Sequence, residues 1–395
     1  MKTQKYKRTI ARMGLTLAFA LGAATACESP DPTETTTGTT MSTGGTGGAG
    51  ASGGAGGTGG GGTAGSGGGA QACAPDMNIA PNDNPACMQL DTDYQPGKDD
   101  TWQACISDDG VFHPFDPNIS SNARVAAFEK MAELLGWGQG KAPTPDDFLA
   151  ARVEYSVDQG LESRVSRRED EHYPAAAKKC QDMTPAELAM NPDRCVGPAQ
   201  IQPLLNAAFT DGIDGKDPAL NAARLDAGLL WFLYVSVYKE ATSCTDTQVD
   251  CDSSWGYCFG GETPDKSLGL GRYVRVRSGQ ANQFIWNGLL AVRCWRDLDN
   301  PAGVAMDLNL LEKARSQLDR GLLRGVALIV RQRALALPCD PAWETVSILG
   351  KVLDREATVR DPANAQKMRD ELAKGKDGID VQAYVAALDL VFPCP

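Results

Sequence analysis

The spacing of apolar residues predicts a helical chain between residues 122 and 391. Several of the apolar patterns are preceded by an Asp or Thr followed by proline. These pairs are Thr144-Pro145, Thr184-Pro185, Asp217-Pro218, Asp340-Pro341 and Asp361-Pro362. Such side chains accept the free N–H groups of a first helical turn, and proline suits the first helical position. The predicted helices cover 122–135, 145–170, 184–190, 198–210, 218–241, 268–298, 303–336, 341–358, 362–374 and 380–391. No stretch shows the period-two alternation of a strand, so the fold class is all-α, a multi-helix bundle.

Three of these helices have a predicted place in the bundle. The short connection at Asn300-Pro301 makes 268–298 and 303–336 antiparallel neighbours. The helix 218–241 is almost entirely apolar between Gly228 and Val235, so we expect it at the centre. Residues 121–395 would form this helical domain, and residues 73–120, which are rich in Cys, Asp and Pro, would be irregular.

The first 72 residues follow a different pattern. A basic stretch, an apolar stretch from Met13 to Ala24 and small residues before Cys27 predict a signal peptide over residues 1–26. The cleavage point resembles a bacterial lipobox, which implies a lipid on Cys27; the alternative is an ordinary signal peptide cut after Ala26. Residues 27–72 continue as a Gly/Ser/Thr-rich tether, which we expect to be disordered because it has little apolar surface to bury.

The net charge restricts the class of binding partner, and the cysteine content indicates the cellular compartment. The net charge of the 395 residues is −12, which argues against nucleic acid as a partner. Eleven cysteines besides Cys27 predict disulfide-stapled loops in an exported protein. Cys180 with Cys195 and Cys339 with Cys394 are the predicted pairs, and the odd number leaves at least one thiol free or paired between chains. The tether resembles those of Gram-negative lipoproteins, which implies an outer-membrane or cell-surface location with the domain in the periplasm or outside.

Acidic residues lie on helix faces that are otherwise apolar. They are Glu154, Asp158, Glu162, Asp226, Glu240, Glu312 and Asp319. Burying a carboxylate is costly unless it is paired or binds a cation. The favoured interpretation is a set of ion pairs with arginines such as Arg277 and Arg315, and Glu312, Arg315 and Asp319 are predicted to be buried and mutually paired. The competing interpretation is a site for a hard cation between helices, with these seven acids as the candidate ligands.

Few residues offer catalytic chemistry. Outside the Gly-rich tether we find no phosphate-binding loop and no nucleophile motif, and the chain has only two histidines, His113 and His172, each expected in a solvated loop. No catalytic residue is predicted, and a binding protein is favoured over an enzyme.

The segment Asp250-Cys-Asp-Ser-Ser-Trp-Gly-Tyr-Cys-Phe-Gly-Gly261 resembles an element of two families. It is similar to the WDEA-x-x-YY-x-G element of algal low-iron-inducible periplasmic iron-assimilation proteins and of imelysin-like bacterial lipoproteins. Arg272-Tyr273 and Phe284 to Trp286 would occupy the long helix that follows. The resemblance covers about residues 145–335 and implies an all-helical periplasmic fold. The GxHxxE motif of imelysin-type peptidases does not occur.

Together these observations predict an envelope-anchored lipoprotein with an all-helical domain that binds a small ligand or a metal ion. A metal ion is the favoured ligand, with iron or another hard cation as the candidate. Its partners would be the membrane, through the lipid anchor, and that ligand. One alternative is a structural or adhesive surface protein that holds an anion or a glycan on Arg-rich helices. Another is an imelysin-type peptidase. The sequence leaves the oligomeric state open.

Overall fold

The computed structural model describes residues 82–97, 100–299 and 306–394. These residues contain thirteen α-helices and no strand, which confirms the all-α prediction. The helices are α1 (Ser120–Leu134), α2 (Pro145–Tyr155), α3 (Leu161–Val165), α4 (Pro185–Met190), α5 (Gln202–Ile213), α6 (Pro218–Ser243), α7 (Val249–Phe259), α8 (Gly269–Arg275), α9 (Gly279–Asp299), α10 (Leu308–Leu335), α11 (Asp340–Arg360), α12 (Pro362–Ala373) and α13 (Val381–Val391). The predicted signal peptide, Cys27 and the tether lie outside the described residues.

Local capping chemistry begins three helices where the sequence places them. The side chains of Thr144, Thr184 and Asp361 each accept a hydrogen bond from a backbone N–H three residues later. Asp217 stands at the N-cap position of α6 without a side-chain bond, and Asp340 is already the first residue of α11. A cap therefore fixes the start of a helix to within a residue or two.

Two predicted helices are each divided in two. The expected helix 145–170 is interrupted. The helix α2 ends at Tyr155, and α3 begins at Leu161 after a turn in which Gln159 adopts a left-handed conformation with φ of 56°. The expected helix 268–298 breaks before α9, where the Ser278 hydroxyl accepts from the Ala281 N–H and caps a new helix. The helix α7 is missing from the predicted set. Its first turns hold Asp250, Asp252 and two serines, which have modest helix propensity.

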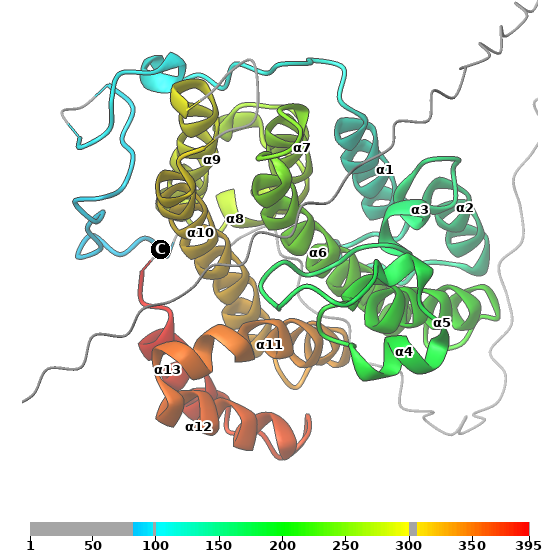
Figure 1. The fold of residues 1–395 in the computed structure, drawn as a ribbon. Helices are drawn as coiled ribbons and strands as arrows, with labels where there is room; N and C mark the ends of the chain where they lie inside the picture. Colours follow the sequence, from blue (N-terminus) through cyan, green and yellow to red (C-terminus); the bar gives the residue numbers. More distant parts are fainter. Residues whose placement is uncertain (1–81, 98–99, 300–305, 395) are drawn as a thin grey trace, which may run out of the picture. The chain divides into compact units, whose positions relative to one another are not determined.

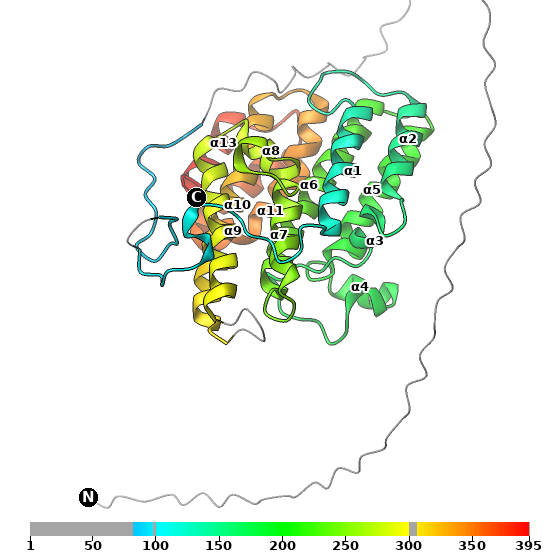
Figure 2. The same cartoon turned by 90° about the horizontal axis from the view of Figure 1, so that it is seen from above.

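The apolar helix α6 lies at the centre of the bundle (Figure 1). It packs against α5, α7 and α11, and its residues Leu229 and Leu233 are completely buried. The helices α9 and α10 pack along each other, as the short connection between them predicts. Viewed from above, α1 and α2 lie beside α5, and α13 lies near α10 (Figure 2). The centre of the bundle therefore brings α6, α10 and α11 within reach of one another.

Disulfide bonds connect parts of the chain that are far apart in sequence. The described pairs are Cys87–Cys394, Cys105–Cys294, Cys180–Cys195 and Cys244–Cys251. The predicted Cys180–Cys195 bond is confirmed. The predicted Cys339–Cys394 bond is wrong, because the segment around Asn84 runs beside Pro393 and brings Cys87 to Cys394; Cys339 is disulfide-bonded as well.

Within the described ranges Cys258 is a free thiol, and it is buried. None of the helices in the same ranges has the length and apolar character that crossing a membrane requires.

Candidate functional site

His172 lies between α3 and α4, buried among polar side chains from other elements. Its Nδ1 is 2.6 Å from Asp170 Oδ1, and its Nε2 is 3.1 Å from Asp319 Oδ1 on α10. The Tyr234 hydroxyl on α6 donates to the same Asp319 oxygen at 3.1 Å. The His172 side chain is only 4% exposed, so the two carboxylates replace water at both ring nitrogens. The expectation of a solvated loop histidine is wrong for His172.

Two tyrosines of α6 and one arginine of α11 complete the surroundings of this ring. Tyr234 and Tyr238 are four residues apart and share a face of α6. Both rings stack on the imidazole of His172, with centroid separations of 5.6 and 3.8 Å. The Arg355 guanidinium lies 4.0 Å from Asp319 Oδ2. The group thus joins α6, α10 and α11 to the segment that carries His172.

Opposing effects set the protonation of His172. Burial lowers the pKa of His172 because it removes water from the charged ring. The charge of Asp319 and the hydrogen bonds to Asp170 and Asp319 outweigh burial and raise this pKa to about 9. Burial acts to raise the pKa of Asp319, but the charges of His172 and Arg355 and the hydrogen bond from His172 lower it overall.

At neutral pH the group is therefore an imidazolium between two carboxylates. Both ring nitrogens of His172 carry protons and donate to Asp170 and Asp319. An imidazolium has no lone pair with which to bind a metal ion or accept a proton. This arrangement suits His172 to a fixed positive charge and not to general-base chemistry.

A cavity of about 200 Å³ opens beside this group. Charges of both signs line it. Lys351 and Arg355 come from α11, whereas Asp170 and Asp193 come from the segment between α3 and α5. Tyr173, Trp231 and Tyr234 add aromatic surface, and Gln200 adds an amide. The cavity is therefore small, polar and amphoteric.

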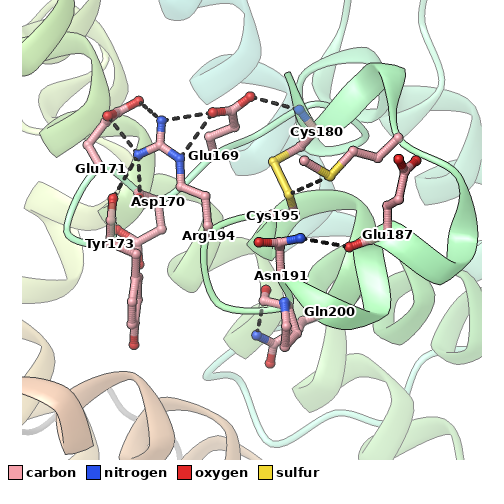
Figure 3. The surroundings of a disulfide bond; sticks show 12 residues. Glu169, Asp170, Glu171, Tyr173, Cys180, Glu187, Asn191, Arg194, Cys195 and Gln200 are labelled. Carbon is pink, nitrogen blue, oxygen red and sulfur yellow. Dashed lines mark hydrogen bonds and ion pairs between the residues drawn. A yellow bond between two sulfur atoms is a disulfide. The ribbon is translucent and has the colours of Figure 1, made fainter. Parts of the chain in front are cut away.

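Arg194 fixes the segment that carries Asp170, His172 and Tyr173 (Figure 3). Its guanidinium bonds the carboxylates of Glu169 and Glu171 at 2.8 Å each, and it also donates to the carbonyl oxygens of Asp170 and Tyr173 at 3.1 Å. The neighbouring Cys195 is held by its disulfide to Cys180. In Figure 3 the Tyr173 ring points away from Arg194 towards α11. One arginine and one disulfide thus hold this wall of the cavity in place.

The structure separates the three residues Glu312, Arg315 and Asp319 that were expected to pair together. Arg315 does contact Glu312, as predicted. Glu312 is nevertheless 62% exposed, and Asp319 bonds His172 in place of Arg315. Glu312 lies one helical turn after the exposed Leu308, on a side of α10 outside the buried stripe of Leu311, Ala314 and Leu318.

Three of the other acidic candidates form internal pairs, which agrees with the ion-pair interpretation. Asp226 accepts from the Tyr273 hydroxyl at 2.7 Å and lies 3.6 Å from Arg333. Glu240 pairs with Arg168 at 2.9 Å, and Glu162 pairs with Arg152 at 2.8 Å. Arg277 donates to the carbonyl oxygen of Tyr273 at 2.7 Å.

The predicted row Glu154, Asp158 and Glu162 does not exist, because α2 ends at Tyr155. The buried face of α2 is also not the one that carries its larger aliphatic side chains. Leu149, Val153 and Val157 are exposed, whereas Phe148, Ala151 and Tyr155 are buried.

The acidic candidates do not assemble into a metal centre. Across residues 82–97, 100–299 and 306–394, no three His, Cys, Asp or Glu side chains come together as a metal site requires. Asp226, Glu240 and Asp319 lie in separate groups, each with its own cationic partner. The hard-cation interpretation is therefore not supported, and the amphoteric cavity beside His172 is the candidate site.

Comparison of the chain with protein-family models, curated proteins and solved structures found no match. The resemblance of residues 250–261 to iron-assimilation and imelysin-like proteins stays a prediction. These residues lie in α7 and its C-terminal cap, where Gly260 adopts a left-handed conformation.

Proposed function

We propose that this chain is an envelope-anchored lipoprotein whose helical domain binds a small zwitterionic solute in the cavity beside His172. The observation that carries the proposal is the meeting of both signs of charge around one small cavity. Lys351 and Arg355 lie on α11, whereas Asp170 and Asp193 lie on the segment between α3 and α5. A ligand with one carboxylate and one ammonium group matches this distribution.

The size and walls of the cavity support the same class of ligand. Its 200 Å³ is below the roughly 300–1,000 Å³ of clefts that hold drug-sized molecules, which favours a ligand of amino-acid size. A carboxylate would form charge-assisted hydrogen bonds with Arg355 and Lys351. An ammonium group would be attracted to Asp170 and Asp193 and to the aromatic faces of Tyr173 and Trp231.

The chemistry of His172 supports binding in preference to catalysis. Both of its N–H groups are engaged by carboxylates, so the ring serves to hold Asp170 and Asp319 in position. Arg355 lines the cavity and is held by Asp319 at 4.0 Å and by Glu356 at 3.5 Å. In the proposed complex this guanidinium is a positioned cation that an incoming carboxylate would share with these two acids.

The compartment is supported by two independent features. The described disulfides indicate an oxidising, exported environment. The basic and apolar N-terminus with small residues before Cys27 supports lipidation at that cysteine. We propose the outer membrane of a Gram-negative bacterium as the attachment site.

Titration calorimetry of the detergent-solubilised full chain with single amino acids tests the ligand class. Glycine, leucine, glutamate and lysine are the probes. We expect at least one to bind, and Lys351→Met to weaken that binding about tenfold through loss of a charge-assisted contact. Lys313→Met, at an exposed lysine of α10, is the matched control and should bind like the parent. If none of the probes binds at millimolar concentration, or if Lys351→Met binds as tightly as the parent, the proposed ligand class is wrong.

A further inference from the structure

Four arginines gather on one side of α7, away from the cavity beside His172. Arg124 on α1 is buried and donates to the Tyr257 hydroxyl at 3.3 Å. Arg168 is also buried, and its guanidinium lies 5.3 Å from the centre of the same Tyr257 ring. Arg164 and Arg167 are half-buried, at the end of α3 and in the turn that follows, and their charges act on Arg124 and on each other. Two guanidinium groups thus meet at one tyrosine, and two more flank them.

The positive charges in this group have little compensation. Among the described residues, the hydrogen-bond partners of Arg124 are uncharged acceptors, namely Ser120 Oγ, the Gln159 carbonyl oxygen and the Tyr257 hydroxyl. Arg168 pairs with Glu240, but Lys239 shares that carboxylate. Within the part of the chain that the structure describes, no carboxylate pairs with Arg164 or Arg167, and the Nε of each is buried without a hydrogen-bond partner.

The nearby acids are engaged elsewhere. Glu162, on the same short helix as Arg164, bonds Arg152 at 2.8 Å, and Glu169 bonds Arg194. Burial, together with the positive charge of Arg164, lowers the pKa of Arg167, which shows that these like charges repel one another. A local excess of positive charge is unusual in a chain whose net charge is −12, and burying it unpaired is costly.

We propose that Arg124, Arg164, Arg167 and Arg168 form a binding site for a tetrahedral oxyanion of the phosphate class. Arginine's planar fork of N–H donors matches phosphate oxygens in pairs. A phosphate carries about 1.5 to 2 negative charges at neutral pH, so it balances this group better than a single carboxylate. The half-buried Arg164 and Arg167 would make the first contacts with the anion, and the buried Arg124 and Arg168 would supply the positive field behind them.

The left-handed backbone at Gln159 is part of this arrangement. Its φ is 56°, which is uncommon for a residue with a Cβ. This conformation lies in the turn between α2 and α3, where the Gln159 carbonyl oxygen accepts from Nε and Nη2 of Arg124. The turn thereby orients one guanidinium of the site.

The test is thermal unfolding of the full chain in inorganic phosphate, compared with sodium chloride of equal ionic strength. We expect phosphate to raise the unfolding temperature, because a ligand that binds the native state stabilises it. Arg164→Gln and Arg167→Gln should each weaken phosphate binding at least about tenfold. Without phosphate both variants should be at least as stable as the parent, because each removes a repelled charge. If either arginine instead stabilises the fold, its Gln variant would be less stable than the parent in the absence of phosphate.

Two control variants test whether phosphate binds at these four arginines and not elsewhere. Arg369→Gln, at an arginine of α12 that pairs with Asp354, and Lys351→Met, in the cavity beside His172, should both keep the phosphate affinity of the parent. Equal stability in phosphate and chloride would overturn the proposal, as would unchanged phosphate affinity in Arg164→Gln and Arg167→Gln. If glucose 6-phosphate binds with the same affinity as inorganic phosphate, the phosphate group alone accounts for recognition. If glucose 6-phosphate binds more tightly, the ligand is a phosphorylated sugar.

Discussion

Asp319 on α10 holds the Nε2 of His172 at 3.1 Å, although 147 residues separate the two in the chain. The contact joins the longest helix of the described bundle to an irregular segment that Arg194 and a disulfide also restrain. Its energy depends on charge, because His172 must be protonated to donate to both Asp319 and Asp170. The stability of this part of the protein should therefore depend on pH.

We expect the protein to lose stability as the pH rises from about 6.5 to about 9. The pKa of His172 in the folded protein is raised from 6.5 to about 9, so the folded state binds the proton more tightly than the unfolded state. The resulting stability is complete below pH 6.5 and is lost as the pH passes through 9. At about 1.4 kcal/mol per pKa unit the contribution is roughly 3 kcal/mol. Urea unfolding at several pH values measures it.

The matched variants for this prediction are His172→Gln and His113→Gln. His172→Gln should remove most of the decline in stability between pH 6.5 and 9. His113→Gln, at the other histidine, which lies at the surface beside Asp109, should keep it. A parent protein whose free energy of unfolding is flat across this range would show that His172 is not held as a buried cation.

Local chemistry made much of the fold predictable. Helix starts such as Thr144 and Thr184 depend on a side chain and a backbone N–H three residues apart, and the apolar run of α6 marks the centre whatever surrounds it. The interruption near Gln159 is a turn with a left-handed residue, and the interruption at Ser278 is a helix cap. Both lie inside a continuous apolar pattern. For that reason the sequence read as continuous helix at both places.

The site was much less accessible to sequence reasoning. One signal was local: Asp170 stands two residues before His172 within an acidic run. Tyr234, Asp319 and Arg355 meet this histidine only because α6, α10 and α11 pack together, and no spacing in the chain records that. Asp319 was correctly singled out as an acid on an apolar face, but its partner was assigned from the same helix because helical spacing reveals only neighbours within one helix.

Two substitutions on α10 should differ sharply in cost. Asp319→Ala removes one partner of a buried charged group and leaves His172 and Arg355 short of negative charge, so we expect a loss of about 3–5 kcal/mol. Arg315→Met breaks a contact with the exposed Glu312 and a hydrogen bond to Thr242, and should cost less, about 1–2 kcal/mol. Urea denaturation of both variants at pH 6 provides the comparison. Equal costs would contradict the difference between their partners, because Asp319 bonds the buried His172 whereas the carboxylate beside Arg315 is exposed.

Removing the Cys180–Cys195 disulfide should destabilise the protein by about 3 kcal/mol. Its sequence separation is 15 residues, and closing a loop of that length restricts the unfolded chain by roughly this amount. The double variant Cys180→Ser/Cys195→Ser is compared with the parent by urea unfolding under non-reducing conditions. Peptide mapping after alkylation of the unfolded, unreduced parent provides the check. Finding free thiols at Cys180 and Cys195 in that parent would remove the basis of the prediction.

Membrane attachment should depend on Cys27. The small residues before this cysteine and the basic, apolar stretch that precedes them predict cleavage and lipidation there. Each buried CH₂ group of an acyl chain contributes about 0.8 kcal/mol to membrane binding, so loss of the acceptor thiol in Cys27→Ser should move the protein to the soluble fraction. Ser29→Ala keeps the thiol and should fractionate with membranes like the parent. A soluble parent would favour the ordinary signal peptide cut after Ala26, and a Cys27→Ser variant that still sediments with membranes would rule out this cysteine as the anchor.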